Sequence, residues 1–135
     1  MREYAVLQTA VLLRRLAFQV NRAAKNGEAD AIHDLRVAIR RFSRALRAFA
    51  QFFPDGSGKK VRRQLVQVMN AAGGVRDQDI ALELLAEAGI PAHSAIVTHL
   101  ATERRHASRE LLRELRRWRT RNFSRKWRSQ LELQP

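Results

Sequence analysis

The sequence has no cysteine and few residues that interrupt secondary structure, with three prolines and six glycines among 135 residues. Without cysteine there can be no disulfide, no thiolate metal site and no cysteine nucleophile. So little proline and glycine excludes a collagen-like chain, and a hydrophobic fraction of 45% argues against disorder. We expect one folded domain, because a chain of this size buries roughly two thirds of the surface that it exposes when unfolded.

Long apolar runs are also missing. No stretch reaches the roughly 18 residues that a membrane-spanning helix requires. The amino-terminal stretch MREYAVLQTAVLLRRLAF carries charged residues where a signal peptide would be apolar. We therefore expect a cytoplasmic protein.

Acidic residues are scarce relative to basic ones. The chain has 13 Asp and Glu against 26 Lys and Arg, which gives a formal net charge of +13. Such an excess favours a polyanion as partner. Of the 26 cations 22 are arginine, whose planar guanidinium binds two phosphate oxygens at once.

Apolar residues recur at three- and four-residue intervals along most of the chain, which is typical of amphipathic helices. This spacing predicts helices over about residues 2–25, 30–53, 61–72, 77–88 and 91–119. Residues typical of helix ends separate them: Asn26-Gly27, Asp30 as an N-cap, Pro54, Gly73-Gly74 and Pro91. Because the connections are short, we predict an all-α fold, an antiparallel four-helix bundle with an additional short helix.

The predicted bundle covers residues 2–119. Residues 120–135 are basic and weakly periodic, and they form either a basic C-terminal tail or a short docking helix. In the first helix Leu7, Leu13 and Phe18 are candidates for the core face.

The stretch IHDLRVAIRRFSRALR, residues 32–47, combines an apolar face with a row of cations. At about 100° per residue, five side chains fall within an arc of about 80°, next to the apolar arc. These are His33 and the four residues that we call the arginine ladder, Arg36, Arg40, Arg44 and Arg47. Like charges four residues apart cost about a few tenths of a kcal/mol, and no acid lies on the row. We interpret the row as a binding surface; a solubilising face is the alternative.

Cations gather on two further predicted helices. They are Lys59, Lys60, Arg62 and Arg63 at the start of the third, and Arg105, Arg109, Arg113 and Arg116 on the last. The first group opposes the helix dipole, so helix stability does not explain it. We expect function or an external anion to be the cause.

The spacing His33-x-x-Arg36-Val37-x-x-Arg40-Arg41-x-x-x-x-Leu46-Arg47, followed by GGVRDQDI at residues 73–80, resembles the CHAD domain, the conserved histidine α-helical domain. The resemblance covers residues 2 to about 119. It implies a helical bundle that binds inorganic polyphosphate through a basic surface, association with polyphosphate granules or phosphate metabolism, and no established catalytic activity.

In one respect the chain departs from that family. Its members typically have two four-helix halves, each with a His-Arg helix, whereas this chain has one. Either it works as a half-sized monomer, or two copies form a homodimer that rebuilds the two-half domain. We favour the homodimer, because symmetric pairs are the commonest assemblies.

Polyphosphate is a flexible chain of negative charges without bases, so its site needs rows of cations rather than stacking rings. The predicted polyphosphate-binding residues are His33, Arg36, Arg40, Arg44, Arg47, Lys59, Lys60, Arg63, Arg105, Arg109 and Arg113. We expect neither a cofactor nor a catalytic residue. His33 either contacts phosphate or bonds a neighbouring backbone group.

Other titratable residues favour structural roles. His93, His99 and His106 lack carboxylates or cysteines at ligand spacing, so we expect no metal site. Asp77 and Asp79 resemble a metal-binding acid pair, but we expect them to cap a helix start, with either one able to orient a ladder arginine. Arg76 either faces the anion or pairs internally.

Two other functions stay open. Nonspecific nucleic-acid binding is the main alternative, and Trp118, Phe123 and Trp127 among cations of the tail would serve RNA or an anionic membrane. A helix-turn-helix across residues 65–88 is disfavoured by the acids in its second half. The third class is an interaction module for an acidic protein.

Overall fold

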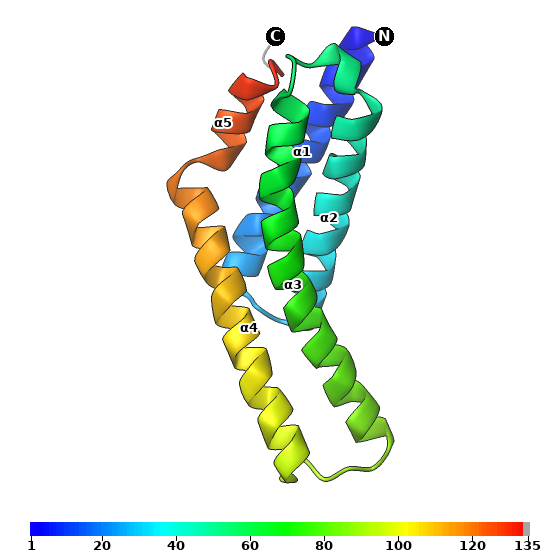
Figure 1. Ribbon diagram of the computed structural model, residues 1–135, viewed down its shortest axis with the longest axis vertical. Helices are drawn as coiled ribbons and strands as arrows, with labels where there is room; N and C mark the ends of the chain where they lie inside the picture. The colour runs from blue at the N-terminus through cyan, green and yellow to red at the C-terminus, as the bar shows by residue number, and fades with distance from the viewer. Residues whose placement is uncertain (134–135) are drawn as a thin grey trace.

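The computed structural model describes residues 1–133, and over that range it contains helices and no strands. Four long helices run alternately up and down the long axis, and a short fifth helix lies near both chain ends (Figure 1). The elements are α1 (Arg2–Lys25), α2 (Ala29–Ala48), the 3-10 turn η1 (Ala50–Phe52), α3 (Ser57–Glu87), α4 (Ala95–Thr120) and α5 (Phe123–Gln130). The predicted all-α fold is confirmed. None of the described helices is long and apolar enough to cross a membrane.

The third helix differs from its prediction. We expected a break at Gly73-Gly74 and a new helix from about Asp77, but α3 continues through both glycines to Glu87. Gly74 lies where α3 meets α4, and a Cβ at its position would be 3.8 Å from the Cβ of Ala107. Each glycine costs about 1 kcal/mol in a helix. The packing of α3 against α2 and α4 offsets that cost.

Helix starts also differ from the sequence signals. Asp30 lies in the first turn of α2 rather than at its cap, which is Glu28 without a side-chain bond. Pro91 precedes α4 by several residues. The cap of α4 is Ser94, whose Oγ accepts a hydrogen bond from the backbone N–H of Val97 at 3.4 Å.

The core face of α1 is only partly the predicted one. Leu13 is buried as expected, but Leu7 and Phe18 are each 65% exposed. Leu16 and Val20 are buried instead, both without exposed surface. Apolar residues occur on every face of α1, so their spacing alone does not show which face is buried. On α2 the predicted apolar face is the buried one.

The tail docks on the bundle as the helix α5. Trp127 has no exposed surface and stacks on Phe42 of α2 with ring centroids 6.1 Å apart. Trp118 and Phe123 pack edge-on or tilted against the same ring system. Residues 134 and 135 of the predicted tail lie outside the described part of the chain.

The helices α3 and α4 extend well beyond α1 and α2 as a two-helix hairpin (Figure 1). Buried side chains of α3 end at Val75, and those of α4 begin at Leu111. Arg104 lies where the hairpin leaves the bundle. It bonds to Asp79 and to the backbone of Gly27 in the α1–α2 loop.

Candidate functional site

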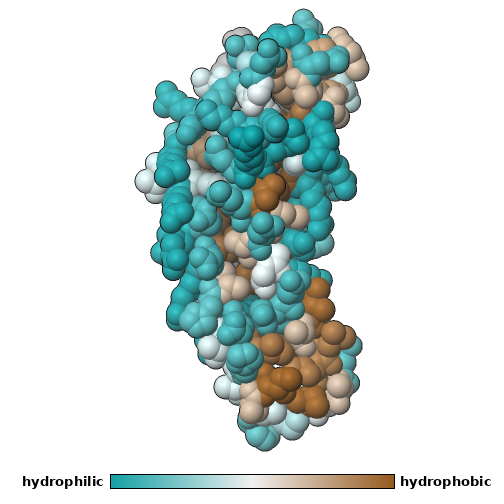
Figure 2. All heavy atoms as spheres, in the orientation of Figure 1, coloured by the Kyte–Doolittle hydropathy of each residue, from teal (hydrophilic) through white to brown (hydrophobic). Residues whose placement is uncertain are grey.

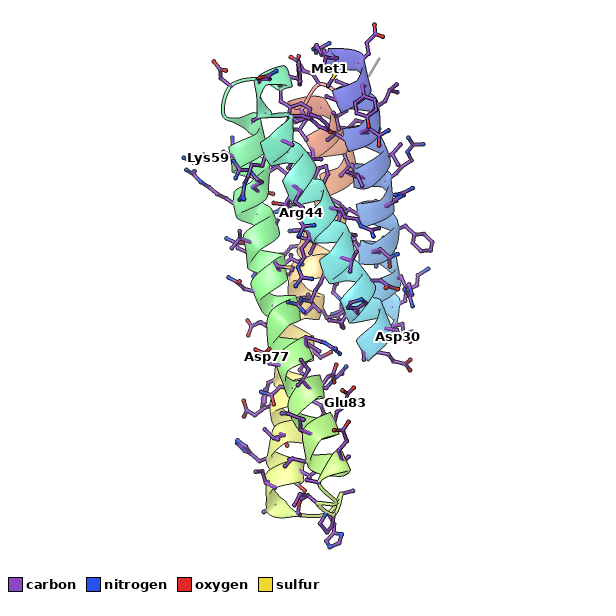
Figure 3. All side chains as sticks on the ribbon, turned by 90° about the vertical axis from the view of Figure 1, so that its right-hand side faces the viewer. Met1, Asp30, Arg44, Lys59, Asp77 and Glu83 are labelled. Carbon is purple, nitrogen blue, oxygen red and sulfur yellow. The ribbon has the colours of Figure 1, made fainter. Side chains whose placement is uncertain are left out.

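The arginine ladder lies along the solvent side of α2, next to α3. Arg40, Arg44 and Arg47 are exposed, and Arg36 is half-buried. Figure 3 shows Arg44 on α2 beside the start of α3, where Lys59 projects outward. Because α2 buries its opposite face, the ladder is held on a rigid element rather than on a loop.

No ladder arginine forms an ion pair within the described residues. The ion pairs there are Arg2–Glu132, Arg22–Asp34, Arg104–Asp79, Arg113–Glu110 and Arg117–Glu114. The exposed surface of α2 beside α3 therefore presents guanidinium groups with free donors. Such groups bind anions with charge-assisted hydrogen bonds.

A shallow groove of about 210 Å³ separates α2 from α3 at the middle of the ladder. Arg40 and Arg44 line one wall, and Val66 and Met69 of α3 line the other. The apolar lining supports the aliphatic stems of the arginines, while the charged ends remain in water. We call this feature the ladder groove.

At the hairpin end of the ladder, three guanidinium groups and one carboxylate lie close together. Burial lowers the pKa of Arg36, the charge of Arg40 lowers it further, Asp77 raises it, and Arg76 lowers it again. The Nε of Arg36 is buried and has no hydrogen-bond partner. An anion bound here would relieve the repulsion among the three cations.

The cations at the start of α3 divide between two faces. Arg62 and Arg63 lie one turn, and Lys59 two turns, before the groove residue Val66. Lys60 projects about 160° away from Arg62, on the side of α4 and α5. By helical spacing Arg62 lies on the α2 side of α3, next to the ladder groove, and Lys60 lies away from that side.

The three predicted α4 cations are on a different surface. α4 packs against α3 and α1, so α3 lies between it and α2. Arg105, Arg109 and Arg113 are exposed, and Arg113 lies 3.7 Å from Glu110. The structure does not bring them to the ladder.

The four histidines lie at the surface. His33 is exposed at the end of the ladder row, and His93, His99 and His106 are exposed elsewhere. Within residues 1–133 no group of three metal-ligating side chains is present.

The expected capping by Asp77 and Asp79 is wrong, because both lie inside the continuous helix α3. Asp79 accepts a hydrogen bond from Arg104 at 2.9 Å. Asp77 lies near Arg36, which is the second role that we allowed it. Arg76 faces the same cluster. Arg76 and Ile80, four residues apart, lie one turn apart on the same helix only because α3 is continuous. The break that we predicted at Gly73-Gly74 concealed this relationship.

Comparison with known proteins gives one match. A family model described as "CHAD domain" matches residues 9–135, which includes α2, α3 and the docked helix α5. No curated protein and no solved structure matches the chain.

Proposed function

Since this chain belongs to the CHAD domain family, whose domain is known in polyphosphate-related proteins, we propose that it binds inorganic polyphosphate in the ladder groove. The observation that carries the proposal is the row of ladder arginines without ion pairs among the described residues. From Arg36 to Arg47 the row is about 17 Å long at about 1.5 Å per residue. A linear polyanion can lie along such a row and contact each turn. In this proposal the protein binds polyphosphate without catalysing a reaction, in the cytoplasm or at a polyphosphate granule.

The aromatic residues beside the ladder and in the tail argue against nucleic acid as the ligand of the ladder groove. Base-stacking platforms need exposed rings among the cations. Phe42 has no exposed surface, and Trp118, Phe123 and Trp127 are buried in the contact of α4 and α5 with the bundle. The tail therefore lacks the stacking surface that its composition suggested.

A helix-turn-helix is absent between residues 57 and 87. That segment is one helix, so no turn separates a recognition helix from its support. What remains for nucleic acid is nonspecific contact with its phosphates. An acidic protein would contact the same ladder. Competition binding distinguishes an acidic protein and nucleic acid from polyphosphate as ligands.

Competition binding tests the proposal. Fluorescently labelled polyphosphate is titrated with the protein near 0.15 M salt, and unlabelled polyphosphate, duplex DNA and polyglutamate compete at equal total charge. We expect polyphosphate to displace the label at the lowest concentration, and affinity to fall steeply as salt rises. Equal competition by DNA or polyglutamate would contradict the assignment.

Pairing of two copies is proposed as well. Two four-helix units would then lie together, as in the two-half domain that the family resemblance implies. The charge and apolar pattern of the surface indicates which faces meet.

A further inference from the structure

The α3–α4 hairpin tip, residues 77–103, has an apolar face that no other part of residues 1–133 covers. Ile80, Leu84 and Ile96 are 40%, 59% and 53% exposed. Figure 2 shows a brown patch at this end of the molecule, opposite the chain termini. Ile80, Glu83, Leu84 and Glu87 follow helical spacing, so apolar and acidic groups share one face of α3.

The hairpin tip also has the opposite charge to the rest of the protein. It contains five of the 13 carboxylates and none of the 26 Lys and Arg. These carboxylates are Asp77, Asp79, Glu83, Glu87 and Glu103, of which Asp79 is already paired with Arg104. An acidic apolar surface on a chain of net charge +13 favours a basic apolar surface as its partner.

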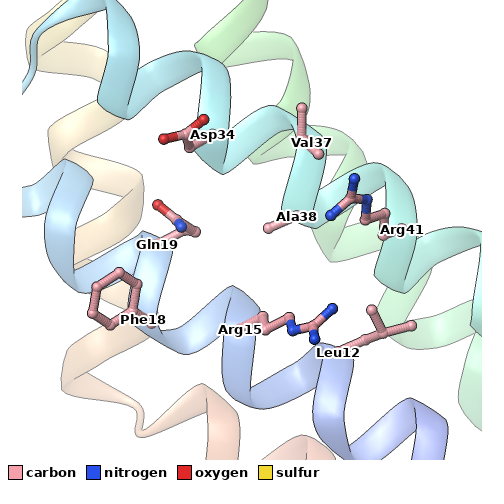
Figure 4. A pocket seen from close by; sticks show the side chains of 8 residues that line it. All are labelled: Leu12, Arg15, Phe18, Gln19, Asp34, Val37, Ala38 and Arg41. Carbon is pink, nitrogen blue, oxygen red and sulfur yellow. The ribbon is translucent and has the colours of Figure 1, made fainter.

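A surface of that kind lies on the outer side of α1 and α2. Figure 4 shows the groove, in which Arg15 of α1 and Arg41 of α2 flank the apolar side chains of Leu12, Phe18 and Val37. Its volume is about 200 Å³. Neither arginine forms an ion pair within residues 1–133.

The one acid that lines this groove is already neutralised. Asp34 forms an ion pair with Arg22 of α1. The net charge of the lining is therefore positive. We call it the α1–α2 groove.

We propose that two copies of this chain pair reciprocally, the hairpin tip of each packing into the α1–α2 groove of the other. This inference rests on the pairing proposed above and specifies its surfaces. A two-fold axis across the long axis makes both contacts equivalent. The bare face of the hairpin tip is about 18 Å long and about 20 Å wide, the width of two helices. Each copy contributes this face and a groove of similar area, which together cover roughly 700 Å² per copy. This area is close to the ~800 Å² of a standard interface.

The pairing leaves the ladder groove open. On α2 the ladder is centred about 115° from the side chains that line the α1–α2 groove, so the partner covers a different edge of the helix. Pairing and polyphosphate binding are thus separable. A variant that loses one should keep the other.

Charge reversal on each surface tests the inference. Glu83→Arg with Glu87→Arg reverses the hairpin tip, and Arg15→Glu with Arg41→Glu reverses the groove. By light scattering at 5 to 200 μM we expect a dimer for the wild type and a monomer for each double variant. An equimolar mixture of the two variants should be dimeric, because each mixed contact then joins opposite charges.

A matched control keeps the result interpretable. Arg116→Glu with Arg119→Glu makes the same change in net charge as the groove variant, at exposed α4 positions, and should remain dimeric. Circular dichroism confirms that all variants fold, and titration with polyphosphate shows whether binding persists in the hairpin variant. A monomeric wild type, a dimeric groove variant or a monomeric mixture would each overturn the pairing. If instead the wild type is dimeric but does not bind polyphosphate, the pairing stands and the proposed function is wrong.

Discussion

Arg104 of α4 and Asp79 of α3 form an ion pair at the point where the hairpin leaves the bundle. The Nε of Arg104 donates to the Asp79 carboxylate at 2.9 Å, and its terminal nitrogen donates to the carbonyl of Gly27 at 2.8 Å. Their side chains are only 24% and 13% exposed. One guanidinium therefore joins α3, α4 and the α1–α2 loop.

We expect Arg104→Ala to lower the free energy of unfolding by about 1–3 kcal/mol, because it leaves a mostly buried carboxylate and a carbonyl without their donors. Urea denaturation followed by circular dichroism measures the change. The neighbouring exposed residue provides the control: Arg105→Ala should change stability by less than about 0.5 kcal/mol. Equal losses in both variants would show that the ion pair is not a stabilising contact.

Reversing the centre of the ladder should weaken polyphosphate binding strongly. For Arg40→Glu with Arg44→Glu we expect at least a tenfold loss of affinity, since each charge-assisted contact contributes about 1.5–3 kcal/mol. Helicity should be unchanged, because both side chains are exposed.

The same charge change on α4, Arg105→Glu with Arg109→Glu, is the comparison for the ladder variant. It should cost about threefold or less near 0.15 M salt, since surface charges farther away than about 8 Å are largely screened. Isothermal titration with polyphosphate distinguishes the two. Similar losses for both variants would mean that only net charge matters.

Asp77 should oppose anion binding. It lies near Arg36 and raises the pKa of that arginine, but its own negative charge also repels a phosphate group. We expect Asp77→Asn to bind polyphosphate a few-fold more tightly, because a negative charge is removed from the hairpin end of the ladder. Asp30→Asn, at the far end of α2 from Lys59 in Figure 3, should leave affinity unchanged. Weaker binding by Asp77→Asn would show that Asp77 positions Arg36 instead.

Removing the ring that docks α5 should destabilise the bundle. Trp127→Ala deletes a fully buried ring that stacks on Phe42 and contacts Trp118. We expect a loss of about 3–5 kcal/mol in the free energy of unfolding. Leu7→Ala, at a position 65% exposed, should cost under about 1 kcal/mol. If α5 merely rests on the surface, the two variants will unfold at similar urea concentrations.

Helix class and the direction of the ladder could be read from local spacing. Ile32, Leu35 and Ile39 repeat at helical intervals, and the structure buries that face and exposes Arg40 and Arg44 on the other. Backbone geometry alone decides which residues of one helix share a face. Spacing was therefore enough to predict that His33 and the ladder arginines up to Arg47 form one row. Local propensity was misleading at Gly73 and Gly74, because the packing of the whole of α3 against α2 and α4 maintains a helix that two glycines would end by themselves.

The sequence by itself determined that this protein is helical, basic and without cysteine, and it determined which side chains share a face of each helix. Only the tertiary structure decided which faces lie together. It brought Arg76 to Arg36, separated the α4 arginines from the ladder, paired Asp79 with Arg104, and left the acidic hairpin tip bare. The physical reason is that periodicity constrains residues three or four positions apart, whereas contacts between helices depend on how the whole apolar surface packs.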